Sequence, residues 1–291
     1  MTDNILSHIL LRHQQNIGST YIAKGKIKEI TSLSNPIIKS LKALHLKKNR
    51  TEDKLFLCEG LKLIIHALDL GWPIKYLVIS KNKISDPLCE QLISKTLVLG
   101  GDVLIVREKI LENLTKRENC QHAVGVFPCL FAQKEDLTLA NENVFLALDR
   151  VRDPGNLGTI IRTADAVGIQ TIILIGDCTD AYALEAVRAT MGSIFAMPLL
   201  KMSEEHFIKF IKTHGIFTIG THLQGALDYR KINYHQKNLC LIMGNEQKGL
   251  TNSLASSCDQ LARIPQIGQA DSLNLAIATG LMLFEAKRHI L

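Results

Sequence analysis

Three short segments in the carboxyl-terminal half of the chain carry polar residues in places where an enzyme needs them. They are residues 153–164 (DPGNLGTIIRTA), 243–250 (MGNEQKGL) and 264–275 (IPQIGQADSLNL). Each places small or turn-forming residues where an apolar strand is expected to meet a helix, and each carries polar side chains that a core does not need. Ligands of open α/β sheets bind at the carboxyl ends of strands, where such loops meet. These segments are therefore the first candidates for a functional site.

The first segment predicts a turn followed by a helix. Proline and glycine in the run 153–156 favour the turn, and Asn156 is expected at the helix N-cap. Arg162 falls opposite the apolar stripe of that helix, where a long side chain can reach back over the turn. Taken alone, the segment is also explained by a capping asparagine and a solvated arginine. It does not have the GxGxxG spacing of a dinucleotide-binding loop.

The second and third segments add a carboxylate, a hydroxyl and an amide. Glu246 directly follows an apolar strand, so leaving it unpaired would be costly, and Arg162 is its expected partner. The pair is interpreted either as catalytic or as purely structural. The segment is not a P-loop, because the Lys-Ser/Thr pair is missing. Ser272 is expected to cap the last helix, whereas Asn274 in the first turn adds little to helix stability.

The overall composition indicates a globular protein with an excess of positive charge. The chain has 291 residues, of which 46% are hydrophobic and 21% charged, and its net charge is +6, which suits a polyanionic partner. Its seven cysteines include no CxxC pair, so reduced thiols are expected, with no metal site. The start does not read as a signal peptide, and no apolar run approaches the ~20 residues of a membrane span. A soluble protein of the cytoplasm is expected.

Apolar periodicity divides the chain into an extension of uncertain order (1–24), a small α/β domain (25–130), a polar linker (131–141) and a larger α/β domain (142–291). In the last, strands rich in isoleucine and leucine alternate with helices, which indicates a mostly parallel sheet covered on both faces. The expected strands are 144–148, 171–175, 217–219, 239–243 and 261–264. The expected helices are 157–167, 181–191, 204–213 and 272–289.

The order and spacing of the three segments resemble the signature motifs of the SpoU (TrmH-like) branch of the SPOUT RNA 2′-O-ribose methyltransferases. The resemblance implies a trefoil-knotted sheet, S-adenosylmethionine as cofactor and a homodimer formed through the carboxyl-terminal domain, with the apolar face of its last helix shared between copies. The catalytic residues that it implies are Asn156, Arg162, Glu246, Ser272 and Asn274. The implied cofactor-binding residues are Thr221, Gly244, Asn245, Ile264, Gln266 and Leu273.

Two further stretches resemble parts of the same family that contact RNA. Residues 188–195 (RATMGSIF) match a segment thought to approach RNA phosphate, which implies RNA binding by Arg188. The amino-terminal domain resembles, more loosely, the substrate-binding domain that precedes many SpoU catalytic domains. Lys39 and Lys42 belong to its basic stretch and are the expected RNA contacts, although a charge run is more often a solvated helix face.

The resemblance predicts methyl transfer to a ribose 2′-hydroxyl, with ribosomal RNA as the main expectation and tRNA as the alternative. Arginine stays protonated in proteins, so Arg162 is expected to act as a cation that stabilises the developing oxyanion, not as a base. A catalytically inactive RNA-binding protein of the same fold is a second reading, which the presence of all five catalytic residues disfavours. A Rossmann-type dehydrogenase is disfavoured by the missing dinucleotide fingerprint.

Overall fold

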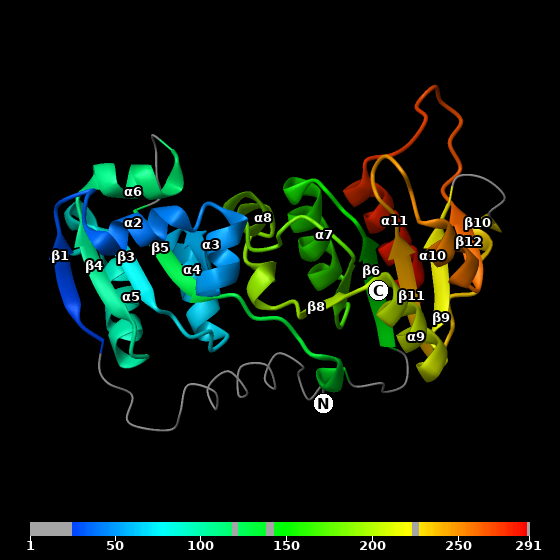
Figure 1. The fold of residues 1–291 in the computed structure, drawn as a ribbon, viewed down its shortest axis with the longest axis horizontal. Coiled ribbons are helices and arrows are strands. Elements are labelled where there is room, and N and C mark those ends of the chain that lie inside the picture. The colour runs from blue at the N-terminus through cyan, green and yellow to red at the C-terminus, as the bar shows by residue number, and fades with distance from the viewer. Residues whose placement is uncertain (1–24, 118–121, 138–142, 223–226, 290–291) are drawn as a thin grey trace. The chain divides into compact units, whose positions relative to one another are not determined.

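The structure is a computed structural model that describes residues 25–117, 122–137, 143–222 and 227–289. The predicted extension 1–24 and part of the predicted linker lie outside the described residues. The described chain forms two compact units (Figure 1). The amino-terminal unit contains residues up to Leu130 together with the later segment Tyr182–Phe195, and the carboxyl-terminal unit contains Phe131–Ala181 and the residues from Ala196 onward.

The amino-terminal unit is built around a five-stranded mixed sheet with the order β1-β4-β3-β5-β2. Strand β5 runs antiparallel to β2 and β3, and the other pairs are parallel. Its strands are β1 (Ile27–Ile30), β2 (Leu55–Glu59), β3 (Tyr76–Ser80), β4 (Asp102–Val106) and β5 (Ala123–Pro128). Its helices are α2 (Pro36–Ala43), α3 (Lys47–Asp53), α4 (Leu61–Asp69), α5 (Pro87–Val98), α6 (Glu108–Thr115) and α8 (Leu184–Ala189), with short 3₁₀ turns at Lys81–Lys83 and Ser193–Phe195.

The carboxyl-terminal unit contains a seven-stranded sheet with the order β10-β12-β9-β11-β6-β7-β8, and all of its pairs are parallel. Its strands are β6 (Asn143–Asp149), β7 (Ile172–Ile175), β8 (Leu199–Met202), β9 (Phe217–Thr221), β10 (Leu227–Asp228), β11 (Asn238–Met243) and β12 (Gln260–Arg263). Its helices are α7 (Pro154–Ala166), α9 (Glu204–His214), α10 (Asn252–Ser257) and α11 (Leu275–Lys287), with 3₁₀ turns at Lys134–Asp136 and Tyr229–Lys231.

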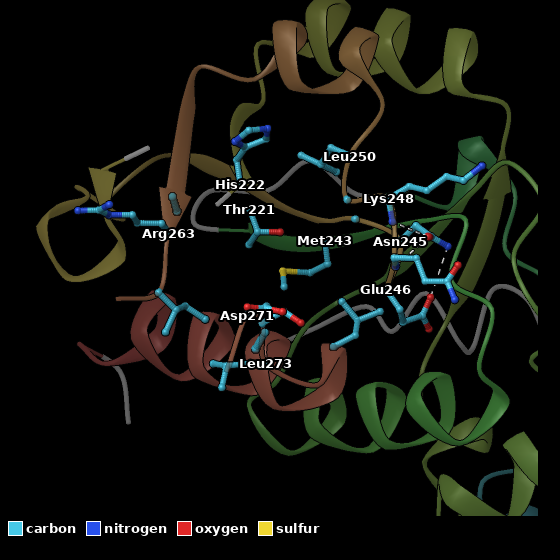
Figure 2. Close-up of a pocket in the computed structure, with 18 of the residues that line it drawn as sticks. Thr221, His222, Met243, Asn245, Glu246, Lys248, Leu250, Arg263, Asp271 and Leu273 are labelled. Atoms are coloured by element: carbon cyan, nitrogen blue, oxygen red, sulfur yellow. Dashed lines mark hydrogen bonds between the residues drawn. The ribbon is translucent and has the colours of Figure 1, made fainter. Parts of the chain in front are cut away.

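The burial of the central strands agrees with a parallel sheet that helices cover on both faces. Every residue of the central strands β6 and β11 is buried, as expected for strands with helices on both faces. Helix α11 packs against α7, and α10 packs against α9, and Figure 2 shows these two pairs on opposite sides of the strands. Because all strands run in one direction, the loops that follow β6, β9, β11 and β12 leave from the same edge of the sheet. The predicted α/β class and parallel sheet are confirmed.

The segment Tyr182–Phe195 completes the core of the amino-terminal unit, although it follows β7 in sequence. The side chain of Phe195 is fully buried, and its backbone oxygen accepts a hydrogen bond of 2.8 Å from Trp72 Nε1. The two rings meet edge to face with centroids 5.1 Å apart, and the ring of Tyr182 lies 4.6 Å from that of Phe56. The predicted helix 181–191 is shorter in the structure, because Ala183 before it is extended and Met191 and Gly192 after it adopt positive φ values.

Truncation of this anchor tests its energetic role. We expect Phe195→Ala to lower the free energy of unfolding by about 3–5 kcal/mol, since it leaves a cavity among packed aromatic rings. Trp72 is the single tryptophan of the chain and touches Phe195, so its fluorescence reports this unit during urea unfolding. The matched control Leu46→Ala, at a side chain that is 64% exposed, should change stability by less than about 0.5 kcal/mol. Equal stability of the two variants would contradict the prediction.

Candidate active site

A cavity of about 480 Å³ lies at the carboxyl ends of β9, β11 and β12, beside the start of α11 (Figure 2). Its size falls within the range of small-molecule sites in proteins. All six residues predicted to bind the cofactor line it: Thr221, Gly244, Asn245, Ile264, Gln266 and Leu273. The structure thus brings together loops that are up to about fifty residues apart in sequence.

The wall of the cavity combines apolar side chains with polar groups. Met243, Leu250 and Leu275 are buried apolar residues of this wall, whereas His222 and Asp271 are exposed polar ones. None of these five was predicted as a site residue from the sequence, although four of them lie inside the segments 243–250 and 264–275 and His222 follows the predicted cofactor residue Thr221. A wall of this kind suits a ligand with a flat, weakly polar ring and a polar tail, and the residues therefore fit S-adenosylmethionine.

The turn after β11 is held in one tight conformation. The backbones of Asn245 and Gly249 exchange two hydrogen bonds of 3.1 and 2.9 Å, and Asn245 Oδ1 accepts from the amides of Gln247 and Lys248. Gly244 has no room for a side chain, because a Cβ there would lie 2.4 Å from the backbone of Gly249. Gly249 itself has φ +63°, which favours glycine. The cavity is therefore bordered by a rigid turn.

Glu246 connects this turn to the beginning of α7. Its carboxylate accepts hydrogen bonds from the backbone amides of Arg152 and Asp153 and a longer one, 3.4 Å, from Asn156 Nδ2. Backbone amides at the start of a helix are natural partners for an anion. The negative charge that follows the buried strand is therefore compensated mainly by the backbone.

The expected ion pair between Glu246 and Arg162 is absent, so that prediction is wrong. Arg162 is exposed and has no hydrogen bond or ion pair with any residue in the described part of the chain. The reason is distance along the helix: Arg162 lies eight positions after Pro154, the first residue of α7, which at about 1.5 Å per residue is about 12 Å. Its guanidinium is consequently not used up by a structural contact.

Two asparagines connect the first motif to the third, and both cap predictions need correction. The N-cap of α7 is Asp153, which accepts from the amide of Asn156, and the N-cap of α11 is Asn274 instead of Ser272. Asn274 Oδ1 accepts from the amides of Ala276 and Ile277, and its Nδ2 donates to Asn156 Oδ1 at 2.9 Å. Ser272 is left exposed on the cavity wall. Glu246, Asn156 and Asn274 thus form a continuous chain of hydrogen bonds across the three motifs.

The predicted RNA contacts have different surroundings. Lys39 and Lys42 are exposed on α2. Arg188 is bonded to buried Glu59, with Nε–Oε2 and Nη2–Oε2 distances of 2.8 and 2.5 Å, and it also donates to the carbonyl of Thr115. A structural ion pair inside the amino-terminal unit therefore accounts for Arg188, and RNA binding by these three residues stays a prediction.

Other classes of site find no support within the described residues. They contain no group of three or more histidine, cysteine, aspartate or glutamate side chains arranged to hold a metal ion. The six cysteines that the structure describes are free thiols, and Cys120 lies outside the described residues. No helix in the described ranges has the length and apolar character needed to cross a membrane.

Comparison with known proteins agrees with the geometry. Residues 143–284 match the SpoU rRNA Methylase family, and residues 35–125 match the MRM3-like substrate binding domain. The 23S rRNA (guanosine(2553)-2′-O)-methyltransferase RlmP of Bacillus subtilis is 31% identical over 90% of this chain and 100% of its own length. The chain belongs to the SpoU rRNA methylase family. The resemblance drawn from the three motifs is therefore confirmed.

Solved structures of this family cover both units. An AdoMet-bound rRNA methyltransferase from Sinorhizobium meliloti is 53% identical, with a TM-score of 0.86 over 91% of this chain and 99% of that one. The SpoU methyltransferase AviRb from Streptomyces viridochromogenes, in complex with AdoMet, is 27% identical, with a TM-score of 0.80 over 88% and 98% of the two chains. The methyltransferase described here thus has the two-part organisation of these relatives.

Replacing the Glu246 carboxylate tests how much it contributes to the stability of the fold. In Glu246→Gln one accepting oxygen becomes an NH₂ donor that faces backbone amides, so we expect the free energy of unfolding to fall by about 1–3 kcal/mol. Chemical denaturation of the purified protein measures this loss. Gln247→Ala, at the exposed neighbour in the same turn, is the control and should leave stability within about 0.5 kcal/mol. A variant as stable as the control would show that the amides do not need the charge.

Proposed function

We propose that this chain transfers the methyl group of S-adenosylmethionine to a ribose 2′-hydroxyl of RNA, and that its substrate is ribosomal RNA. The observation that carries the proposal is the cavity formed by the motif loops, with the Glu246–Asn156–Asn274 chain beside it. Relatives named as 23S rRNA 2′-O-methyltransferases support the substrate. A tRNA substrate is the alternative, because other relatives carry the combined name tRNA/rRNA methyltransferase.

The residues of the site have different roles in such a reaction. When bound, the cofactor supplies an electrophilic methyl group on a positively charged sulfur. A ribose hydroxyl is a weak nucleophile, so the chain must stabilise the oxyanion that develops as the proton leaves. Arg162 is exposed and without a structural partner in the described part of the chain, and it remains protonated. Its guanidinium therefore binds the oxyanion or a neighbouring phosphate.

The side-chain amides of Asn156 and Asn274 act by orientation. Asn274 is fixed as the cap of α11 and holds the side-chain amide of Asn156 by its oxygen. Asn156 then presents its Nδ2 toward Glu246, which is itself held by backbone amides. Because each member fixes the next, the polar groups are ordered before a substrate arrives, which is what electrostatic stabilisation of a transition state requires. Ser272, on the cavity wall, is placed to contact the substrate or the cofactor.

The activity is tested with the full chain, S-adenosylmethionine carrying a labelled methyl group, and purified rRNA or tRNA. We expect label in the 2′-O-methyl ribose of ribosomal RNA, and turnover in Arg162→Ala lower by about a hundred- to a thousandfold with unchanged cofactor affinity by calorimetry. Arg162→Lys should recover little, because the planar fork is lost. Arg288→Ala, at an arginine whose side chain is 74% exposed, is the control and should match the wild type.

The outcomes separate the parts of the proposal. Near-normal turnover in Arg162→Ala would reject the role of Arg162 and leave the activity standing. Labelled methyl groups found only in tRNA would show that tRNA, not ribosomal RNA, is the substrate. Failure of the wild type to bind S-adenosylmethionine would overturn the activity and favour a non-catalytic RNA-binding protein.

We also propose that two copies associate through α11. Three large apolar residues on the exposed side of α11, and one that lies two residues before its start, continue one another at helical spacing. They are Leu273, Ile277, Leu281 and Phe284, with exposed fractions of 36%, 59%, 40% and 53%. The opposite side of the helix, with Met282 and Leu283, is fully buried. With a two-fold axis through this stripe, the stripe of one copy packs against the same stripe of the other copy, as in most homodimers.

Charge placed in the stripe should separate the copies. We expect the wild type to have twice the mass of one chain by light scattering at micromolar concentration, and Ile277→Glu to have the mass of a single chain, since a buried unpaired carboxylate is costly. Leu46→Glu introduces the same charge at an exposed leucine of the amino-terminal unit and should leave the mass unchanged. A monomeric wild type, or a dimeric Ile277→Glu, would contradict this assembly.

The trefoil knot expected from the resemblance also belongs to the proposal. Strand β12 lies between β10 and β9, whereas the helix that follows it, α11, packs against α7 and the central strand β11. This return of the chain from the edge of the sheet to its centre supports a threaded path through the loops of the cavity.

A further inference from the structure

A strained arginine follows directly after the central strand β6. Arg150 has φ +50°, in the left-handed region, which costs a residue other than glycine about 1–2 kcal/mol. Its guanidinium forms a two-pronged ion pair with the preceding residue: Nε–Oδ1 and Nη2–Oδ2 of Asp149 are each 2.8 Å apart. The Asp149 side chain is 1% exposed. Strain of this kind persists only where the surrounding contacts enforce it, and it concentrates at functional sites.

Those contacts lead to the turn that borders the cofactor cavity. Arg150 Nη2 donates to the carbonyl of Gly249 at 3.2 Å, and Asn245 Nδ2 donates to the carbonyl of Arg150 at 2.8 Å. The amide of Thr251 donates to Asp149 Oδ2 at 3.4 Å. Asp149, the last residue of β6, and Arg150, which follows it, therefore hold the turn 244–250 at its start and at its end. Arg150 and Asp149 are not among the residues that line the cavity.

Stability alone does not explain this pair. An ion pair with a buried carboxylate gains little over apolar residues of the same shape, because Asp149 loses its hydration. Here the pair is combined with a left-handed arginine, which adds a further cost, while a glycine would adopt that backbone without strain. Hydrogen bonding to Asp149 raises the pKa of Arg150, so the guanidinium stays charged and the fork stays intact. The arrangement therefore fixes the position of the Gly249 carbonyl relative to β6.

We propose that Arg150 and Asp149 are positioning residues for S-adenosylmethionine binding: they hold the Asn245–Gly249 turn in the form that binds the cofactor. The inference rests on the methyltransferase function proposed above. It assigns a role to the first two residues after the apolar part of β6, ahead of the motif that begins at Asp153. The role is indirect, because the pair acts through the turn.

The substitution Arg150→Gly separates positioning from stability. Glycine relieves the backbone strain, but it also leaves the buried Asp149 carboxylate without its cationic partner, so we expect the ligand-free protein to unfold at a lower temperature than the wild type and still to be folded at about 25 °C. Calorimetric titration with S-adenosylmethionine should show a dissociation constant about tenfold higher, which corresponds to about 1.4 kcal/mol. Arg150→Lys keeps the charge without the fork and should lie between the two.

A matched control is present in the amino-terminal unit. Lys54 is also left-handed, with φ +54°, at the end of α3. Lys54→Gly relieves the same kind of strain in the other unit, at a residue that does not line the cavity, so it should raise or preserve stability without any change in cofactor affinity. A second variant, Asp149→Asn, should also weaken cofactor binding. Because both residues act through the same turn, the double variant should bind the cofactor about as well as the single variant with the lower affinity.

Each outcome decides the inference. Cofactor affinity equal to that of the wild type in Arg150→Gly would overturn it. A less stable Arg150→Gly with unchanged affinity would overturn it as well and assign the pair a purely structural role. Absence of binding by the wild type itself would reject the proposed function instead, so the two failures are distinguishable.

Discussion

The arrangement of the site depends on one carboxylate that is bound by the backbone of another motif. Glu246 emerges from the turn after β11 and accepts the amides that precede α7. This interaction joins the two neighbouring strands β6 and β11 at their carboxyl ends, where parallel strands alone fix direction but not the paths of their loops. Because a charge bound to oriented amides has little freedom to shift, the turn and the helix start can hardly move independently.

The same carboxylate explains why the rest of the site is built from amides. Once the backbone has compensated Glu246, a cation beside it would not be needed for charge balance, and an asparagine suffices to continue the network. Asn156 can accept from Asn274 while it donates toward Glu246, which a carboxylate or an arginine could not do. The cationic group of the motif is thus left exposed, on the side of α7 where a polyanionic substrate can reach it.

Sequence patterns predicted the parts of this protein that depend on local burial. Runs such as 144–148 and 239–243 are apolar because both faces of the strands are covered, and that requirement is visible in the composition alone. The residues that the resemblance implied for cofactor binding line the cavity, and most of them belong to the second and third motifs, which follow strands β11 and β12. The residues that cap α7 and α11 were each missed by two or three positions, since several adjacent polar residues can cap a helix equally well.

The features that the sequence did not predict correctly, or did not predict at all, depend on partners distant in sequence or on the backbone conformation. The expected pairing of Glu246 with Arg162 failed because side-chain charge suggests a salt bridge, whereas the backbone amides that actually bind Glu246 leave no mark in the sequence. Arg188 and Glu59 lie 129 residues apart, and nothing in either neighbourhood indicates the other. The strain at Arg150 is also invisible before the backbone is known, because arginine is not a residue that predicts a positive φ.

The aromatic segment around Phe195 has a consequence for how the chain is made. The amino-terminal unit receives part of its core from residues that are synthesised after strands β6 and β7 of the other unit. During translation, Trp72 and Phe56 therefore remain without their final covering while the first strands of the catalytic sheet leave the ribosome. The amino-terminal unit can therefore complete its core only after residue 195 has been synthesised, although its first segment ends at Leu130.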